Sequence, residues 1–195
     1  MAQRVKYIIG VDEAGRGPLA GPVAVAAILI PVGARVPDGV RDSKTLSASR
    51  RERLRGELRA LFPSCVAMVG AATIDRIGIS RAVRLATFRA IRRLTWKSDF
   101  QVADCEVLLD GLLKAPAEFK QKTVIHGDSI VPAISAASII AKTARDRRML
   151  ALHKQFPQYG FDRHMGYGTA AHYVALKKHG LSPLHRKGYC ATFLA

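Results

Sequence analysis

The chain has 195 residues, 49% of them apolar, and its 31 Lys and Arg residues against 15 Asp and Glu residues give a formal net charge of +16. This length and apolar content suit one domain with a packed core and argue against a globally disordered chain. The charge favours a polyanionic partner, because neutralising phosphates releases counterions, although a generally basic, soluble protein would show the same excess.

The first half of the chain is predicted to contain three strands and two helices. Apolar runs at 7–11 and 23–30, separated by little more than a turn, indicate an antiparallel pair of strands. A helical pattern follows over 48–62, and residues 65–72 have the composition of a third strand. A second helix is expected over 80–96.

Spacing also predicts which side chains of these two helices face the core. In the first helix the residues on one stripe are Leu54, Leu58 and Leu61. In the second helix the apolar face is expected to consist of Val83, Thr87, Ala90, Ile91 and Leu94.

In the second half, strands and helices alternate. One apolar strand is expected to end at Asp110 and another at Asp128. A long helix is predicted over 132–156, and a last helix over 169–179. The pattern indicates an α/β domain followed by a small helical piece after about residue 157.

Four carboxylates stand where apolar strands are expected to give way to glycine: Asp12, Glu13, Asp110 and Asp128. Such strand ends are where α/β sheets gather functional groups, so we expect the four side chains to converge. Crowded carboxylates need cations to stay ionised, and their hard oxygen atoms suit Mg²⁺ or Mn²⁺, with substrate phosphate completing the coordination shell. Any one of these acids alone is more simply a turn residue, so the prediction depends on the joint pattern.

The glycine-rich loop at 15–21 does not fit the common phosphate-binding motifs. A P-loop needs a Lys-Ser or Lys-Thr pair directly after its glycines, and the spacing of Gly15, Gly17 and Gly21 is one residue longer than a dinucleotide fingerprint. The neighbouring Asp12-Glu13 pair would also repel a pyrophosphate that carried no metal. Zinc-type Cys/His spacing and a G-x-S-x-G elbow are absent from the sequence.

The sequence also bears on location. It shows no N-terminal signal pattern, and its longest apolar run, at 23–30, is too short to cross a bilayer. Three widely spaced cysteines suit free thiols in a reducing compartment: Cys65, Cys105 and Cys190. We therefore expect a cytoplasmic protein with no membrane partner.

Six segments together resemble bacterial ribonuclease HII, the type 2 ribonuclease H family. They are, in order, GVDEAGRGPLAGPVAVAA, DSKTLS, LLDG, GDS, AISAASIIAKTARDRRM and GYGT, and the resemblance spans residues 7–189. It implies a ribonuclease H-like mixed β-sheet flanked by helices, with a catalytic core over 1–157 and a C-terminal helical substrate-binding extension over 158–195. It also implies an endonuclease that hydrolyses the RNA strand of RNA–DNA hybrids. This family cuts 5′ of ribonucleotides embedded in duplex DNA and leaves 3′-hydroxyl and 5′-phosphate ends.

The resemblance also implies roles for single residues. The family's catalytic and metal-binding acids correspond to Asp12, Glu13, Asp110 and Asp128. The loop whose backbone holds the ribose 2′-hydroxyl corresponds to Gly15, Arg16 and Gly17, and the tyrosine that packs on the sugar after the ribonucleotide corresponds to Tyr167. Contacts to the nucleic-acid backbone are implied for Ser43, Lys44, Ser138 and Lys142. From the residues alone, the last four could equally be capping or solvated residues, and Tyr167 could be a core residue.

The implied mechanism is two-metal hydrolysis with Mg²⁺ or Mn²⁺, one ion bound without substrate and a second bound with it. The resemblance further implies a monomer. The chain departs from the family pattern at His126 and Met165, where lysine is usual. Two alternatives stay open: the sister enzyme ribonuclease HIII, whose loop lacks the arginine, and a non-catalytic protein that only binds hybrids.

Overall fold

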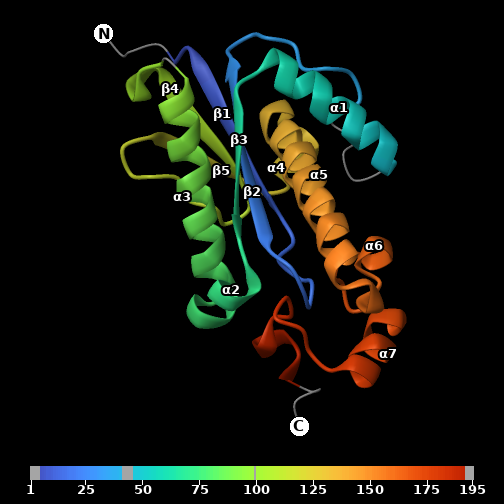
Figure 1. Ribbon diagram of the computed structural model, residues 1–195. Helices are drawn as coiled ribbons and strands as arrows, with labels where there is room; N and C mark the ends of the chain where they lie inside the picture. The colour runs from blue at the N-terminus through green and yellow to red at the C-terminus, as the bar shows by residue number, and fades with distance from the viewer. Residues whose placement is uncertain (1–4, 41–45, 99, 192–195) are drawn as a thin grey trace.

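The computed structural model describes residues 5–40, 46–98 and 100–191, and a five-stranded sheet lies at its centre (Figure 1). The strands are β1 (Tyr7–Ala14), β2 (Val23–Pro31), β3 (Ser64–Val69), β4 (Cys105–Asp110) and β5 (Lys120–Val124). Their order is β3-β2-β1-β4-β5, in which β3, β2 and β1 are antiparallel neighbours and β1, β4 and β5 are parallel ones. The predicted antiparallel pair is confirmed, and so is the α/β class with a mixed sheet.

Helices cover both faces of the sheet (Figure 1). Among the described residues they are α1 (Ala48–Leu61), α2 (Ala71–Ile77), α3 (Ile79–Lys97), α4 (Gly127–Ile130), α5 (Pro132–Gln155), α6 (Phe161–His164) and α7 (Ala170–His179). Helix α3 packs on β2 and β3, whereas α5 packs on β1 and β2 with α1 beside it. No helix within these described residues combines the length and the apolar character needed to span a bilayer.

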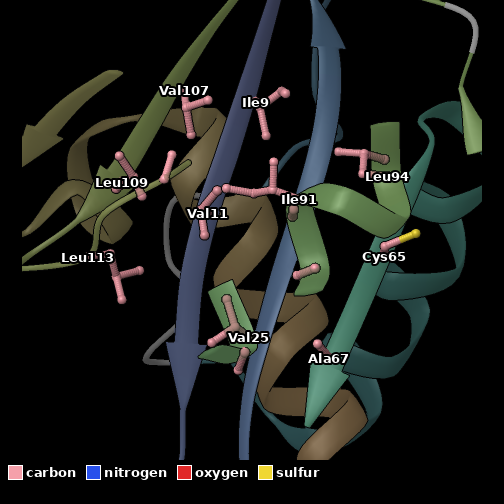
Figure 2. Packing of buried hydrophobic residues seen from close by; sticks show 14 of the residues in the cluster. Ile9, Val11, Val25, Cys65, Ala67, Ile91, Leu94, Val107, Leu109 and Leu113 are labelled. Atoms are coloured by element: carbon pink, nitrogen blue, oxygen red, sulfur yellow. The ribbon is translucent and has the colours of Figure 1, made fainter. Parts of the chain in front are cut away.

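Each face of the sheet buries its own apolar cluster. Successive side chains of a strand point to opposite faces, so Val25 and Ala27 of β2 join the cluster under α3, while Ala26 and Ile28 join the cluster under α5. Figure 2 shows the first cluster, with side chains of α3 meeting those of the strands. On the other face, Gly10 lets the first turn of α5 come so close to β1 that a β-carbon would collide with backbone atoms there.

The predicted core face of α3 is confirmed, since all five of its expected residues are buried. The stripe on α1 is only partly right. Leu54 and Leu58 are fully buried, but Leu61 is 59% exposed. The helix ends at Leu61, and the next residue, Phe62, turns into the core in its place.

Two predicted strands end earlier in the structure than in the sequence pattern. Strand β3 stops at Val69, because Gly70 begins the short helix α2, whose Ala71 and Ile74 are buried one turn apart. Strand β5 stops at Val124, and His126, in the left-handed backbone conformation, leads into α4. Asp128 therefore lies on a helix of four residues and not at a strand end.

A third apolar cluster ties the C-terminal segment to the rest of the protein. Its buried members are Leu19, Ala20, Met149, Leu152, Tyr159, Phe161, Leu176 and Cys190. They come from the loop after β1, from the end of α5 and from residues beyond it, so the cluster spans both sides of residue 157. The division of the chain at 157/158 stays a prediction.

Three buried histidines form a hydrogen-bonded group in this segment. His164 accepts from the Gly166 amide at Nδ1, so its Nε2 donates to the Tyr159 carbonyl at 2.9 Å. His172 Nδ1 lies 2.9 Å from the Tyr167 carbonyl, so its Nε2 accepts from His185 Nε2 at 3.0 Å. His185 Nδ1 in turn accepts from the Ser182 amide and hydroxyl. All three rings are satisfied in their neutral forms.

Candidate active site

A cavity of 480 Å³ opens where β1 and β4 end, against one side of α5. Its lining residues are Asp12, Glu13, Ala14, Gly15, Arg16, Gly17, Arg51, Asp110, Asp128, Ser138, Ile139, Lys142 and Tyr167. The structure thus brings together the four predicted acids, the predicted loop and three further predicted residues, Ser138, Lys142 and Tyr167. The remaining two, Ser43 and Lys44, lie outside the described residues.

Parallel pairing of β1 with β4 explains why acids distant in sequence meet. Val11 is paired with Leu109, so Asp12 and Asp110 are the next residues on neighbouring strands. Asp110 Oδ1 accepts a hydrogen bond from the Gly127 amide at 2.7 Å, and this bond anchors α4 beside β4. Ser135 of α5 donates to the carbonyl of Asp128 at 2.6 Å, which fixes α4 from the other side.

The acids of β1 are held in a setting that disfavours negative charge. Asp12 is only 5% exposed, and burial together with the neighbouring Glu13 carboxylate raises its pKa to about 8, against the help of hydrogen bonds from Ser138 and the Glu13 amide. Burial also raises the pKa of Glu13, although Arg16, whose guanidinium lies 3.4 Å from Glu13 Oε1, opposes the shift. The site therefore has more carboxylate than its own cations neutralise.

This environment fits a divalent cation. Glu13 Oε2 is buried and has no hydrogen-bond partner in the described part of the chain. Among the described residues, no three Asp, Glu, His or Cys side chains already form a cage for a metal ion. Mg²⁺ and Mn²⁺ take oxygen ligands and keep several coordination positions for water and phosphate. The residues that would hold the ion are Asp12, Glu13, Asp110 and Asp128.

A pH-dependent stability is expected from Asp12. Its folded pKa of about 8 lies above the ordinary 3.8, so folded protein retains a proton that unfolded protein releases, and metal-free stability should fall as pH rises between these values. Thermal unfolding with a chelator should show this decline, and added Mg²⁺ or Mn²⁺ should reverse it. Asp12→Asn should flatten the decline and remove most of the stabilisation by metal. Glu57→Gln, at a surface acid outside the cavity, should leave both unchanged.

Two buried arginines hold the loop after β1 from behind. Arg186 is fully buried and donates to the carbonyls of Gly15 at 2.6 Å, Arg16 at 2.7 Å and Gly21 at 3.0 and 3.1 Å. Arg145 of α5 is 1% exposed. It donates to the carbonyls of Ala20, Pro22 and Met165. Burial lowers the pKa of both guanidinium groups.

These bonds set the direction of the loop's peptide groups. The C=O and N–H bonds of a trans peptide group point in opposite directions. Because the carbonyls of Gly15 and Arg16 point toward Arg186, the N–H groups of Arg16 and Gly17 point away from it. No group of the described residues accepts a hydrogen bond from either amide. The loop therefore offers two free donors beside the acids.

Gly15 and Gly17 of this loop have different surroundings. Gly15 has φ +91° and faces the Arg145 side chain, so a β-carbon would be both strained and obstructed. Gly17 has no such φ, and a β-carbon would meet only the ring of Tyr167, at 4.0 Å. A β-carbon would therefore fit at position 17, and its absence leaves the backbone there open to close approach.

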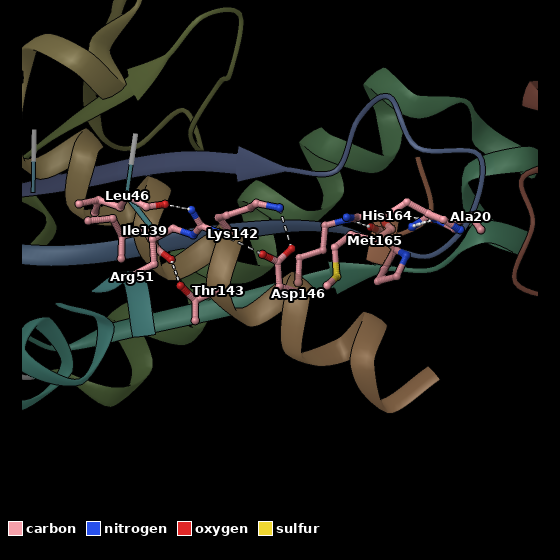
Figure 3. A network of polar contacts seen from close by, with 12 residues as sticks. Ala20, Leu46, Arg51, Ile139, Lys142, Thr143, Asp146, His164 and Met165 are labelled. Carbon is pink, nitrogen blue, oxygen red and sulfur yellow. Dashed lines mark hydrogen bonds and ion pairs between the residues drawn. The ribbon is translucent and has the colours of Figure 1, made fainter. Parts of the chain in front are cut away.

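A second polar network borders the cavity on α5. Lys142 Nζ lies 2.7 Å from Asp146 Oδ1, and Arg51 Nη2 lies 3.8 Å from Asp146 Oδ2. Figure 3 shows the three side chains. Arg51 also donates to the carbonyl of Leu46. From the sequence, Asp146 is expected to pair with neighbouring arginines on the helix surface, but its partners in the structure are the two cations that line the cavity.

The two positions that depart from the family pattern share a backbone feature. Among described residues other than glycine, only His126 and Met165 have positive φ, at 55° and 49°. His126 precedes the helix that carries Asp128, and Met165 precedes the turn that carries Tyr167. Such strained residues cluster at functional sites, where the surrounding structure compensates their cost.

Comparison with known proteins agrees with this geometry. Residues 9–192 match the family described as Ribonuclease HII. The chain is 45% identical over 184 residues to ribonuclease HII of Nitrosospira multiformis, covering 94% of this chain and 89% of that one. It is 46% identical over 187 residues to ribonuclease HII of Geobacter metallireducens, covering 93% and 83%.

Solved structures give the same result. Ribonuclease HII of Archaeoglobus fulgidus, solved as a complex with PCNA, superposes with a TM-score of 0.75 at 26% identity, covering 94% of each chain. Ribonuclease H2 of Pyrococcus horikoshii superposes with a TM-score of 0.73 at 25% identity, covering 96% of each chain. The chain therefore belongs to the ribonuclease HII family, the type 2 ribonuclease H endonucleases.

Proposed function

We propose that this enzyme hydrolyses the RNA strand of RNA–DNA hybrids and cuts on the 5′ side of single ribonucleotides in duplex DNA, leaving 3′-hydroxyl and 5′-phosphate ends. The observation that carries the proposal is the pair of free amides, of Arg16 and Gly17, aimed beside four acids in one cavity. A ribose 2′-hydroxyl accepts hydrogen bonds from such donors, and deoxyribose has no oxygen at that position.

The acids supply the chemistry through metal. Mg²⁺ or Mn²⁺ held by Asp12, Glu13, Asp110 and Asp128 would activate water and neutralise the charge that develops on the leaving oxygen, and substrate phosphate would complete a second ion's shell. The chain's own task is to place the scissile phosphate against these acids. The proposed donors for the flanking phosphates are Ser138 and Lys142 on α5 and Arg51 on α1. The family resemblance adds Ser43 and Lys44, which lie outside the described residues.

The test is cleavage of a DNA duplex that carries one ribonucleotide, with the products mapped to the nucleotide. We expect a single cut 5′ of the ribonucleotide, dependent on a divalent ion, and no cut in the matching all-DNA duplex. A cut at deoxynucleotides would refute ribose recognition, and binding without any cut would identify a passive hybrid-binding protein.

We further propose that the enzyme acts as a cytoplasmic monomer, with residues 158–195 as its substrate-binding extension.

Tyr167→Ala is expected to impair cleavage of a single embedded ribonucleotide far more than cleavage of a long hybrid. The ring lines the cavity, is 44% exposed and has the Arg145 guanidinium 5.7 Å from its centre. Packed on the sugar after the ribonucleotide, it would position the scissile phosphate, and a misplacement of about 1 Å can cost roughly a hundredfold in rate. The measurement is the initial cleavage rate of the variant on each of the two substrates. An equal loss of rate on both would mean that Tyr167 only packs in the structure and does not position the junction.

A further inference from the structure

We propose that a basic track along α3 binds the substrate duplex beyond the acid-lined cavity, which extends the proposed function to a second contact region. The track consists of Arg16, Arg84, Lys114 and Arg92. These cations line two more cavities. One, of 230 Å³, includes Arg16, Arg84 and Lys114 in its lining, and the other, of 590 Å³, includes Arg84, Lys114 and Arg92.

Neighbouring cavities of this series share lining residues. Arg16 lies in the wall between the acid-lined cavity and the second one. Arg84 and Lys114 lie between the second and the third. A strand that leaves the acids past Arg16 would therefore meet Arg84 and Lys114 next, and it would also pass the exposed side chain of Leu112.

All charged side chains of α3 are positive. The helix carries six cations and no carboxylate: Arg81, Arg84, Arg89, Arg92, Arg93 and Lys97. Of these, Arg84 and Arg92 are two turns apart, on the side of α3 that meets the loop after β4. Arg84 and Lys114 form no ion pair within the described residues, whereas Arg92 pairs with Glu118 at 2.8 Å. The guanidinium of Arg84 lies over the Phe88 ring, 5.3 Å from its centre, a contact that does not neutralise its charge. No carboxylate of the described residues therefore competes with phosphate for Arg84 or Lys114.

The dimensions fit a nucleic-acid backbone. Eight residues of helix separate Arg84 from Arg92, which corresponds to about 12 Å at 1.5 Å per residue. One strand of a duplex advances about 3.4 Å per phosphate, so the track matches roughly four nucleotides on one side of the cleavage site. The two outer cavities also have apolar lining, Leu112 and Phe88 among it, so the choice of a nucleic acid rests on the four cations and not on a lack of apolar surface.

The experiment measures binding of duplexes with one ribonucleotide to Asp110→Asn protein, which should bind without cutting. Extending the duplex by about four base pairs on one side of the ribonucleotide should raise affinity, and the same extension on the other side should not. Arg84→Ala/Lys114→Ala should remove this gain. The matched control, Arg89→Ala/Lys97→Ala, removes the same charge from exposed positions outside the track and should retain the gain.

Salt dependence gives a second readout. Two lost phosphate contacts should reduce the slope of log affinity against log salt by about 2, so the deficit of the track variant should grow about tenfold between roughly 200 and roughly 50 mM salt. An equal deficit in the control variant would refute a localised track, and so would a gain that persists in Arg84→Ala/Lys114→Ala. Normal cleavage of the short duplex in the track variant would leave the proposed function standing in either case.

Discussion

Asp110→Asn is expected to abolish cleavage of the ribonucleotide-containing duplex while leaving the fold and duplex binding intact. The amide oxygen of asparagine can still accept the hydrogen bond from the Gly127 amide, but the side chain loses the charge that would hold a divalent ion. Loss of an outer-shell partner costs about 10- to 100-fold in activity, so loss of a direct ligand should cost more. Single-turnover rates with Mg²⁺ and Mn²⁺, with thermal unfolding as the check on folding, test this.

Asp146→Asn is the matched control on the same cavity. Its carboxylate contacts Lys142 and Arg51 and would not contact the metal, so the variant should raise KM and leave kcat almost unchanged. If Asp110→Asn retained near-normal turnover, the metal-site assignment would be wrong.

Arg186→Lys is expected to remove the preference for a ribonucleotide. Lysine keeps the charge but has one nitrogen, which cannot span the carbonyls of Gly15, Arg16 and Gly21 that the guanidinium holds together. The amides of Arg16 and Gly17 would then lose their common direction, and a shift of about 1 Å should cost roughly a hundredfold in cleavage. Binding to the all-DNA duplex, which needs no 2′-hydroxyl contact, should change little.

Arg145→Lys separates this effect from a general loss of stability. Arg145 is equally buried and packs against Gly15, but it donates to Ala20, Pro22 and Met165. Its replacement should therefore disturb the Tyr167 side of the cavity, while Arg186 still holds the carbonyls of Gly15 and Arg16. The affinity ratio of the ribonucleotide duplex to the all-DNA duplex, measured without cleavage in Ca²⁺, distinguishes the two variants. A ratio that fell equally in both would assign Arg186 a purely structural role.

The convergence of the acids could be predicted from sequence because strand ends are a local signal. A run of apolar residues that stops at an Asp next to glycine marks one edge of the sheet, and parallel pairing places the ends of β1 and β4 together. For Asp128 the sequence predicts a strand end, because its apolar run continues past Val124 to Ile125. The turn at His126 depends on a left-handed backbone, which has no strong signal in a residue other than glycine or asparagine.

The two arginines were missed because sequence patterns treat arginine as a surface residue. For Arg145 a signal exists: it stands four residues after Ala141 and four before Met149, both fully buried, so it falls on the core stripe of α5. Arg186 follows no periodic pattern, and its partners lie about 170 positions earlier in the chain. Only the fold brings that loop and the C-terminal segment together.

The three buried histidines make the C-terminal segment sensitive to acid. In each neutral ring the hydrogen-bond partners determine which nitrogen carries the proton. A second proton on His172 would sit on its Nε2, which would then be an N–H donor facing the N–H donor at His185 Nε2. Burial lowers the pKa of all three histidines, that of His185 to about 4. Below about pH 6.5 the unfolded segment therefore binds protons that the folded segment does not bind, and the free energy of unfolding decreases as the pH is lowered. His185 directly precedes Arg186, which holds the Gly15–Gly17 loop. Acid should therefore weaken the contact between Arg186 and the carbonyls of Gly15 and Arg16.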